Sequence, residues 1–295
     1  MYTRLTPKAV PFFMVLPLIL LFLSLAMFPF GYMIYISFHD YNLAEGGSPT
    51  FIGVQNYLAM FRDNVALSSI RFTLLLVCTA VPIELGLGIA IALFIRGITG
   101  EKVIRSSLLL PMMIPSVVAG IAWKMLYNYE YGPMNYFLSF FGIPRISWLG
   151  NYTFAQIGII LADVWQWTPF IFLILYAGLQ SIPRELAEAA KVDGASEFEI
   201  TRFIELPLLG PLIGVSLIIR IIDVLKVFDI IYMVTWGGPG SATHSLSYYI
   251  YKVGVSFGWD IGYAAAISLV LLGSIVALTT FLIRMLRLKK SLGFE

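Results

Sequence analysis

Four charged residues lie at regular spacings of three within one apolar stretch near residues 208–235. They are Arg220, Asp223, Lys226 and Asp229. A charged side chain at the centre of a membrane costs about 2.5–3.5 kcal/mol on insertion scales, so such residues usually mark a functional pathway. In a helix, this spacing lets Arg220 pair with Asp223 and Lys226 with Asp229. The pattern predicts polar groups that line a substrate path, which we favour, or else two structural ion pairs.

The elements that must position these charges are continuously apolar runs. Of the 295 residues, 59% are hydrophobic and 12% are charged, whereas ordinary soluble domains have about 45–50% and 25%. A helix crosses a hydrocarbon core of roughly 30 Å with about 20 residues, whereas barrel strands alternate over about ten. The sequence predicts an all-α membrane protein, a single domain over 1–295, with six transmembrane helices near 12–38, 69–95, 104–127, 154–181, 208–235 and 262–286.

The distribution of lysine and arginine predicts the orientation of these helices. One set of termini and loops holds twelve of the nineteen basic residues, the opposite set holds four, and three lie inside spans. Because basic loops stay in the cytoplasm, we expect both termini and the loop at 182–207 to be cytoplasmic. The net charge of +2 offers no basic face for nucleic acid. We find no nucleophile and base at convincing spacing and no metal-ligand cluster, so the chain has no predicted catalytic or metal site.

Two prolines interrupt the third apolar run. Pro111 and Pro115 remove backbone donors four residues apart, which predicts a break in that helix. The break is either a tolerated kink or a flexible wall of a pathway, since transporter helices are often discontinuous.

The loop at 182–207 has more internal structure than solvation requires. Pro183 suits the first turn of a helix, Gly194 ends that helix, and Ser196 with Glu199 forms a capping box for a second helix. Apolar residues within the loop predict docking onto something outside the bilayer, although packing against the chain's own helices is the alternative for some of them. These residues are Leu186, Ala189, Ala190, Val192, Phe198, Ile200 and Phe203.

This loop resembles the EAA motif of binding-protein-dependent ABC importer permeases. That motif has Glu-Ala-Ala, a glycine four residues after the last alanine, and Ile-x-Leu-Pro ten residues further on. Other strings resemble the carbohydrate branch of the family and its first-permease type, with the maltose and glycerol-3-phosphate permeases. They are Phe51 to Tyr57, Leu110-Pro111 with Ile114-Pro115, Trp123 and Asn128, and FDIIYMVTWGGPGSAT at 228–243.

The resemblance implies a type I importer fold in which a cytoplasmic coupling helix sits in a groove of an ATPase. It also implies a sugar site on the helices that flank the loop, at the depth reached by about 15 residues, or about 22 Å, from each loop edge. Arg220 with Asp223 departs from a neutral site and leaves room for an acidic or phosphorylated sugar. The implied coupling residues are Glu188, Ala189, Ala190, Asp193, Gly194, Ala195, Ile204, Leu206 and Pro207. The implied pathway residues are Gln166, Trp167, Phe170, Arg220, Asp223, Val224 and Val227.

The resemblance further implies partners and a location. The partners are a second permease subunit in a heterodimer, two ATPase subunits, a periplasmic or extracellular solute-binding protein, a carbohydrate and membrane lipid. No cofactor is expected on this chain, because it has no phosphate-binding loop and ATP with Mg would bind the ATPase. We expect a transport subunit of a bacterial or archaeal cytoplasmic (inner) membrane rather than an enzyme. The alternative is an ion-coupled secondary transporter that uses the charges of the fifth span.

Overall fold

The structure is a computed structural model that describes residues 9–285 and the side chains of residues 14–285. The predicted cytoplasmic termini lie outside the described residues. The chain divides into two compact units, Met1–Asp63 with Ile250–Val270, and Asn64–Tyr249 with Leu271–Glu295. Each unit is described by itself.

The first unit combines an apolar helical segment with a small hairpin. Asn56 ties the hairpin to the helix end, because its Nδ2 donates to the carbonyl oxygens of Ser37 and His39, each at 2.9 Å. Gly262 lies so close to the hairpin that a Cβ there would be 2.2 Å from the His39 oxygen. The elements of this unit are α1 (Ala9–Phe22), the π-helical turn η1 (Leu23–Met27), α2 (Phe28–Ser37), β1 (His39–Asp40), antiparallel β2 (Thr50–Phe51), α3 (Gln55–Met60), η3 (Lys252–Ser256) and the start of α15 (Ile261–Met285).

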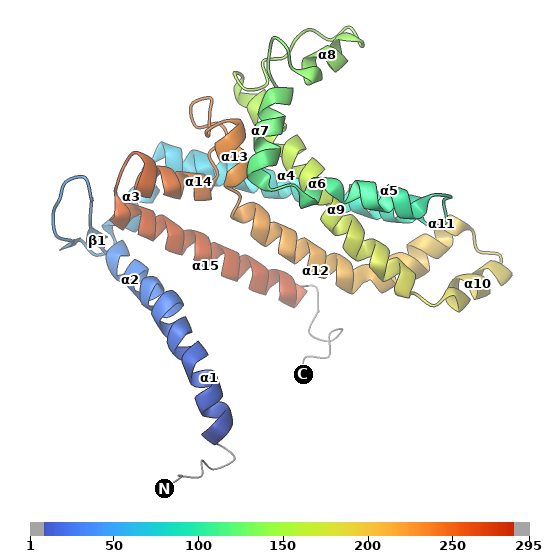
Figure 1. Ribbon diagram of the computed structural model, residues 1–295, viewed down its shortest axis with the longest axis horizontal. Coiled ribbons are helices and arrows are strands. Elements are labelled where there is room, and N and C mark those ends of the chain that lie inside the picture. Colours follow the sequence, from blue (N-terminus) through green and yellow to red (C-terminus); the bar gives the residue numbers. More distant parts are fainter. Residues whose placement is uncertain (1–8, 286–295) are drawn as a thin grey trace. The chain divides into compact units, whose positions relative to one another are not determined.

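The second unit is a bundle in which α4, α9 and α12 contact one another (Figure 1). Packing between membrane helices depends on close approach rather than on the hydrophobic effect. Gly88 of α4 allows that approach, since a Cβ there would lie 2.7 Å from a methyl of Ile171 in α9. The elements are α4 (Asn64–Ile95), α5 (Glu101–Leu108), α6 (Leu110–Met113), α7 (Ser116–Leu126), α8 (Pro133–Ser139), α9 (Tyr152–Ser181), α10 (Arg184–Val192), α11 (Glu197–Ile200), η2 (Thr201–Glu205), α12 (Leu206–Leu225) and α13 (Asp229–Val234); α14 (Leu246–Tyr251) extends from this unit into the other.

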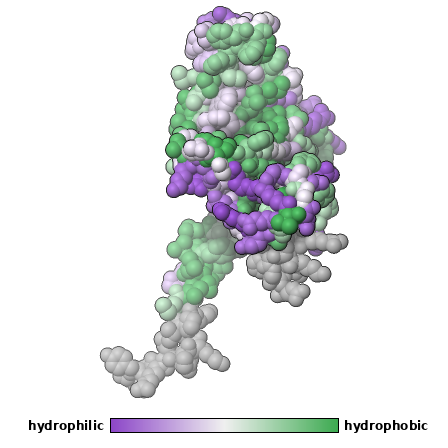
Figure 2. Space-filling model, turned by 90° about the vertical axis from the view of Figure 1, so that its right-hand side faces the viewer, coloured by the Kyte–Doolittle hydropathy of each residue, from purple (hydrophilic) through white to green (hydrophobic). Residues whose placement is uncertain are grey.

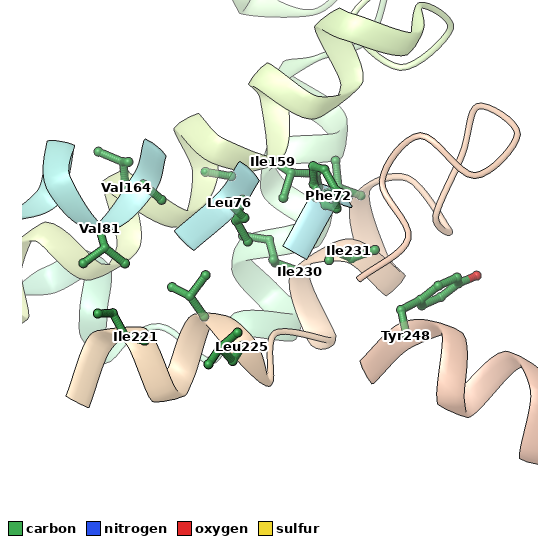
Figure 3. Close-up of a cluster of buried hydrophobic side chains, with 14 of the residues drawn as sticks. Phe72, Leu76, Val81, Ile159, Val164, Ile221, Leu225, Ile230, Ile231 and Tyr248 are labelled. Carbon is green, nitrogen blue, oxygen red and sulfur yellow. The ribbon is translucent and has the colours of Figure 1, made fainter. Parts of the chain in front are cut away.

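Buried apolar side chains from four helices meet in the core of this bundle. Phe72 and Leu76 of α4, Ile159 of α9, Ile221 of α12 and Ile231 of α13 belong to one cluster of buried apolar side chains, which Figure 3 shows in close-up. All five are at most 8% exposed. This core fixes the relative positions of the helices that carry the polar residues described below.

The membrane-spanning pattern confirms the predicted all-α fold with six spans. Within residues 9–285, five helices are long and apolar enough to cross a membrane, and a sixth span arises if the bent pair Glu101–Met113 and Ser116–Leu126 counts as one. That pair bends by 94°, so the break predicted from Pro111 and Pro115 is confirmed. The fifth span differs from the prediction of one run over 208–235. Its helix runs from Glu197, inside the predicted loop, to Leu225, and α13 begins only at Asp229.

Candidate functional site

A cavity of about 250 Å³ lies where α12 breaks, opposite α9 and the start of α7. At the break, Phe228 leaves helical geometry with φ −138° and ψ −58°. The Val227 carbonyl, which no longer serves the helix, accepts a hydrogen bond of 2.6 Å from Ser245 Oγ. The break therefore exposes polar groups without leaving this carbonyl unsatisfied. The cavity is lined by Ser116, Asp163, Gln166, Trp167, Arg220, Asp223, Lys226, Val227, Phe228, Asp229 and Ile230.

Arg220 is the centre of a buried ionic cluster that joins α4, α9 and α12. Its Nε donates to Glu84 Oε2 at 2.7 Å, and its Nη2 donates to Glu84 Oε1 at 2.8 Å and to Asp163 Oδ2 at 2.9 Å. The side chains of all three residues are at most 2% exposed. The guanidinium carbon also lies 5.0 Å from the centroid of the Trp167 ring, within cation–π distance. We call Glu84, Asp163 and Arg220 the ionic triad.

The predicted pairing of charges within the fifth span was wrong. Arg220 pairs with Glu84 and Asp163 instead of Asp223, and Lys226 lies 3.5 Å from Asp223 instead of pairing with Asp229. The helix ends at Leu225, so Lys226 and Asp229 do not share one helix and the three-residue rule does not apply to them. Arg220 instead faces the bundle, where two carboxylates from other helices are within reach.

Gln166 connects the cavity to the break in the third span. Ile114 precedes Pro115 and is extended, with ψ 128°, as steric clash with the proline ring requires. Gln166 Nε2 donates to the Ile114 carbonyl at 3.0 Å and lies 3.2 Å from Ser116 Oγ. Gln166 Oε1 is buried and has no hydrogen-bond partner among the described residues. The cavity wall thus carries an acceptor that a ligand hydroxyl could satisfy.

The predicted pathway residues fall into two groups. Five of them line the cavity, namely Gln166, Trp167, Arg220, Asp223 and Val227. The other two do not. Phe170 packs against the apolar cluster around Phe172, with its ring 6.5 Å from that of Trp167, and Val224 is buried in the core. Sequence reasoning missed Glu84, whose only signal was a carboxylate inside an apolar run.

The loop at 182–207 forms the two helices that its sequence predicts. Gly194 adopts φ +86° after α10, a left-handed conformation that favours glycine. Ser196 forms the predicted capping box, with its backbone N donating to Glu199 Oε2 at 2.8 Å and its Oγ accepting from Glu199 N at 3.3 Å. In Figure 1, α10 lies beyond the end of α9, whereas α11 runs through η2 into α12 as one helix of 29 residues from Glu197 to Leu225.

The predicted coupling residues occupy the surface of this loop. Glu188 is exposed and borders a cleft of about 580 Å³ that Arg96, Glu101 and Lys191 also line. The same end of the unit carries hydrophilic surface with apolar side chains among it (Figure 2). Ala189, Asp193, Gly194 and Pro207 are exposed, whereas Ala190, Ala195, Ile204 and Leu206 are half-buried.

The apolar side chains of the loop divide between the two predicted roles. Val192 is 88% exposed, and Phe198 and Phe203 are each 68% exposed. Ile200 is 1% exposed, so it packs within the chain itself. Val192, Phe198 and Phe203 therefore remain exposed on the surface of the described chain.

An ion pair that the sequence did not reveal joins this loop to the second span. Glu205, which precedes the Leu-Pro of the motif, is buried and accepts from Arg96 of the turn after α4. Its other carboxylate oxygen accepts from Thr201 Oγ1 at 3.1 Å. The end of η2, directly before α12, is therefore connected to the turn after α4.

Residues 84–289 match the family described as binding-protein-dependent transport system inner membrane component. The chain belongs to this family. Its members are multi-span permease subunits of ABC transporters in the inner membrane. They are not catalytic, because ATP hydrolysis resides in a separate ATPase subunit.

Several curated permeases resemble this chain over nearly its full length. The trehalose/maltose transport system permease protein MalF of Thermococcus litoralis is 38% identical over 95% of this chain and 94% of its own. The sulfoquinovosyl glycerol transport system permease SmoG of Agrobacterium fabrum is 38% identical over 92% of this chain and 89% of its own. The sn-glycerol-3-phosphate permease UgpA of the same organism is 31% identical over 94% of each chain.

A solved structure shares the fold. A chain of a bacterial alginate ABC transporter, crystallised with an alginate pentasaccharide-bound periplasmic protein, superposes with a TM-score of 0.83 over 94% of each chain. Its sequence identity is 24%. The permease described here therefore has the type I importer fold.

Proposed function

We propose that this permease is one of two membrane subunits of an ATP-driven importer that moves a carbohydrate delivered by an external binding protein. The observation that carries the proposal is the cavity of about 250 Å³, whose polar and aromatic wall belongs to α9 and α12. These are the two helices that lead directly into the loop at 182–207. Transporters place substrates between discontinuous helices near the bilayer midplane, and this cavity lies beside the breaks in α12 and in the third span.

The chemistry of the cavity suits a sugar. Sugars combine hydroxyl groups with apolar ring faces. Trp167 presents an aromatic ring, while Gln166, Asp223 and Asp229 supply acceptors for hydroxyls. The relatives named above are permeases for trehalose or maltose, for sulfoquinovosyl glycerol and for glycerol-3-phosphate, which supports a carbohydrate as the class.

The loop at 182–207 would couple the permease to the ATPase. In this proposal α10 docks in a groove of an ATPase subunit, with Glu188 as the polar contact and Ala189 and Ala190 allowing close approach. Gly194 supplies the turn between α10 and α11. The exposed side chains of Val192, Phe198 and Phe203 support a partner on this surface, because apolar side chains exposed on a polar surface favour docking.

Orientation and subunit composition complete the proposal. Both termini and the coupling loop would face the cytoplasm of a bacterium or archaeon. The complex would contain a second, different permease, two ATPase subunits that bind ATP and Mg, and a binding protein on the opposite side. The alternative of ion coupling is not favoured, because a proton-carrying carboxylate needs access to water and two of the carboxylates, Glu84 and Asp163, are buried against Arg220.

Co-purification from the native host tests this function. Tagged permease should bring down an ATPase subunit and a second permease, and Glu188→Ala should reduce the recovered ATPase by about tenfold. The matched control is Glu130→Gln, an exposed carboxylate in another loop. Absence of any ATPase from the wild-type material would contradict the proposal.

A further inference from the structure

We infer that the cavity at the α12 break selects uncharged polyhydroxylated sugars and rejects anionic ones, with Arg220 as a positioning residue rather than a substrate ligand. The inference rests on the proposed function, since it names the substrate class of the same site. The sequence alone left an acidic or phosphorylated sugar open because an arginine lies at this position.

The charge of the cavity wall is negative. Three carboxylates, those of Asp163, Asp223 and Asp229, face two cations, Arg220 and Lys226, so the lining carries a formal charge of −1. Glu84 does not line the cavity but is bound to Arg220 through two hydrogen bonds, so the arginine already faces a second carboxylate. An anionic group that enters this cavity meets like charge in a medium of lower dielectric than water, where repulsion is strengthened.

Both cations already face carboxylates. Arg220 is 1% exposed, and its Nε and Nη2 donate to Glu84 and Asp163. Lys226 has a side chain that is 54% exposed, but its ammonium lies 3.5 Å from the Asp223 carboxylate. A phosphate, sulfonate or carboxylate on the substrate would have to compete with these carboxylates.

The polar groups of the wall include several acceptors. Gln166 Oε1 is buried at the wall without a hydrogen-bond partner among the described residues. The carboxylate of Asp223 is 39% exposed, and Asp229 is exposed as well. Acceptors need donors, and a sugar hydroxyl donates, whereas a phosphate or carboxylate oxygen at neutral pH only accepts. The wall is thus complementary to hydroxyl groups.

Arg220 acts on this wall through other residues. It holds Asp163 of α9 and Glu84 of α4 against α12, and it lies over the Trp167 ring at 5.0 Å. Trp167 is thereby fixed on the cavity wall with one face covered. Arg220 therefore orients the groups that bind the sugar. The sugar itself contacts Trp167, Gln166 and the exposed carboxylates of Asp223 and Asp229.

Uptake by the complete complex tests the inference. The permease, its second permease, the ATPase and the binding protein are reconstituted in proteoliposomes, and ATP-dependent uptake of trehalose and maltose is compared with that of trehalose 6-phosphate and a glucuronic-acid disaccharide. We expect the wild type to favour a neutral sugar over its anionic counterpart by at least about tenfold. Asp229→Asn should reduce that ratio by at least about threefold, and Lys226→Gln should increase it. Glu130→Gln, an exposed carboxylate outside the cavity, should leave it unchanged.

Two negative results are distinguishable. Preferred, ATP-dependent uptake of an anionic sugar, abolished by Lys226→Gln, would overturn the inference and leave the proposed function intact. Absence of ATP-dependent uptake of every sugar would contradict the proposed function and the inference with it. A ratio that Asp229→Asn leaves unchanged would show that the wall's charge does not select the substrate and would also overturn the inference.

Discussion

Replacing Arg220 with methionine should destabilise the permease more than any other single change of charge in the fifth span. The replacement leaves Glu84 and Asp163, each at most 2% exposed, without the three hydrogen bonds that Arg220 donates to them. Removing one partner of a buried ion pair costs roughly 3–5 kcal/mol, because the remaining charge stays buried and uncompensated. We expect the Tm of the purified permease in detergent to fall by about 10 °C.

Two further variants decide whether the buried charges cause this effect. Lys226→Met removes a cation from the same span, but its pair with Asp223 is largely exposed at 54% and 39%, so it should cost less than about 1 kcal/mol. The triple variant Glu84→Gln, Asp163→Asn, Arg220→Met removes all three charges together and should recover most of the lost stability. Equal Tm values for Arg220→Met and Lys226→Met, or no recovery in the triple variant, would refute the reasoning.

Three other perturbations have outcomes that the structure specifies. Gly88→Val should cost about 1–3 kcal/mol, because α4 and α9 have no room for a side chain there; thermal unfolding measures it. Burial raises the pKa of Asp260, and two nearby carboxylates raise it further. The folded state therefore binds this proton more tightly than the unfolded state, so the free energy of unfolding rises as pH falls through the folded pKa, and Asp260→Asn should remove that pH dependence. Glu205→Gln should weaken the link to Arg96 by about 1–2 kcal/mol and lower the sugar transported per ATP hydrolysed, measured in proteoliposomes.

Each of these predictions has its own control. Gly86→Val adds the same side chain two residues away, where nothing lies within 4 Å, and an equal loss of stability would contradict the packing argument. Stability that keeps its pH dependence in Asp260→Asn would show that another group titrates. Glu130→Gln changes an exposed carboxylate outside the loop at 182–207 and should leave coupling unchanged. If it uncouples transport as strongly as Glu205→Gln does, the buried position of Glu205 is not the cause.

The parts of the molecule that local chemistry determines were predicted from the sequence. The six apolar runs, the break at Pro111 and Pro115, the left-handed Gly194 and the capping box at Ser196 each depend on residues that are close together in the chain. Helix caps, turns and spans follow such local rules, because the groups that satisfy the backbone lie within one turn.

The partners of buried polar groups were not predictable in the same way. Glu84 lies 136 positions from Arg220 in the sequence. Their pairing depends on how α4 rotates against α12, which only the packed bundle decides. The end of α12 at Leu225 was also missed, because apolar residues continue on both sides and no glycine or proline marks the stop. The ion pair of Glu205 was not predicted either, because its partner Arg96 lies in the turn after α4.

Energy coupling is the central claim, and uptake into proteoliposomes tests it most directly. Vesicles that contain the complete complex and its binding protein are supplied with a labelled sugar that the binding protein accepts, with ATP or with a proton gradient. We expect uptake to require ATP and to be independent of the proton gradient. In Glu188→Ala, uptake should fall by at least about tenfold while ATP hydrolysis continues. Uptake that persists without ATP and follows the proton gradient would contradict it.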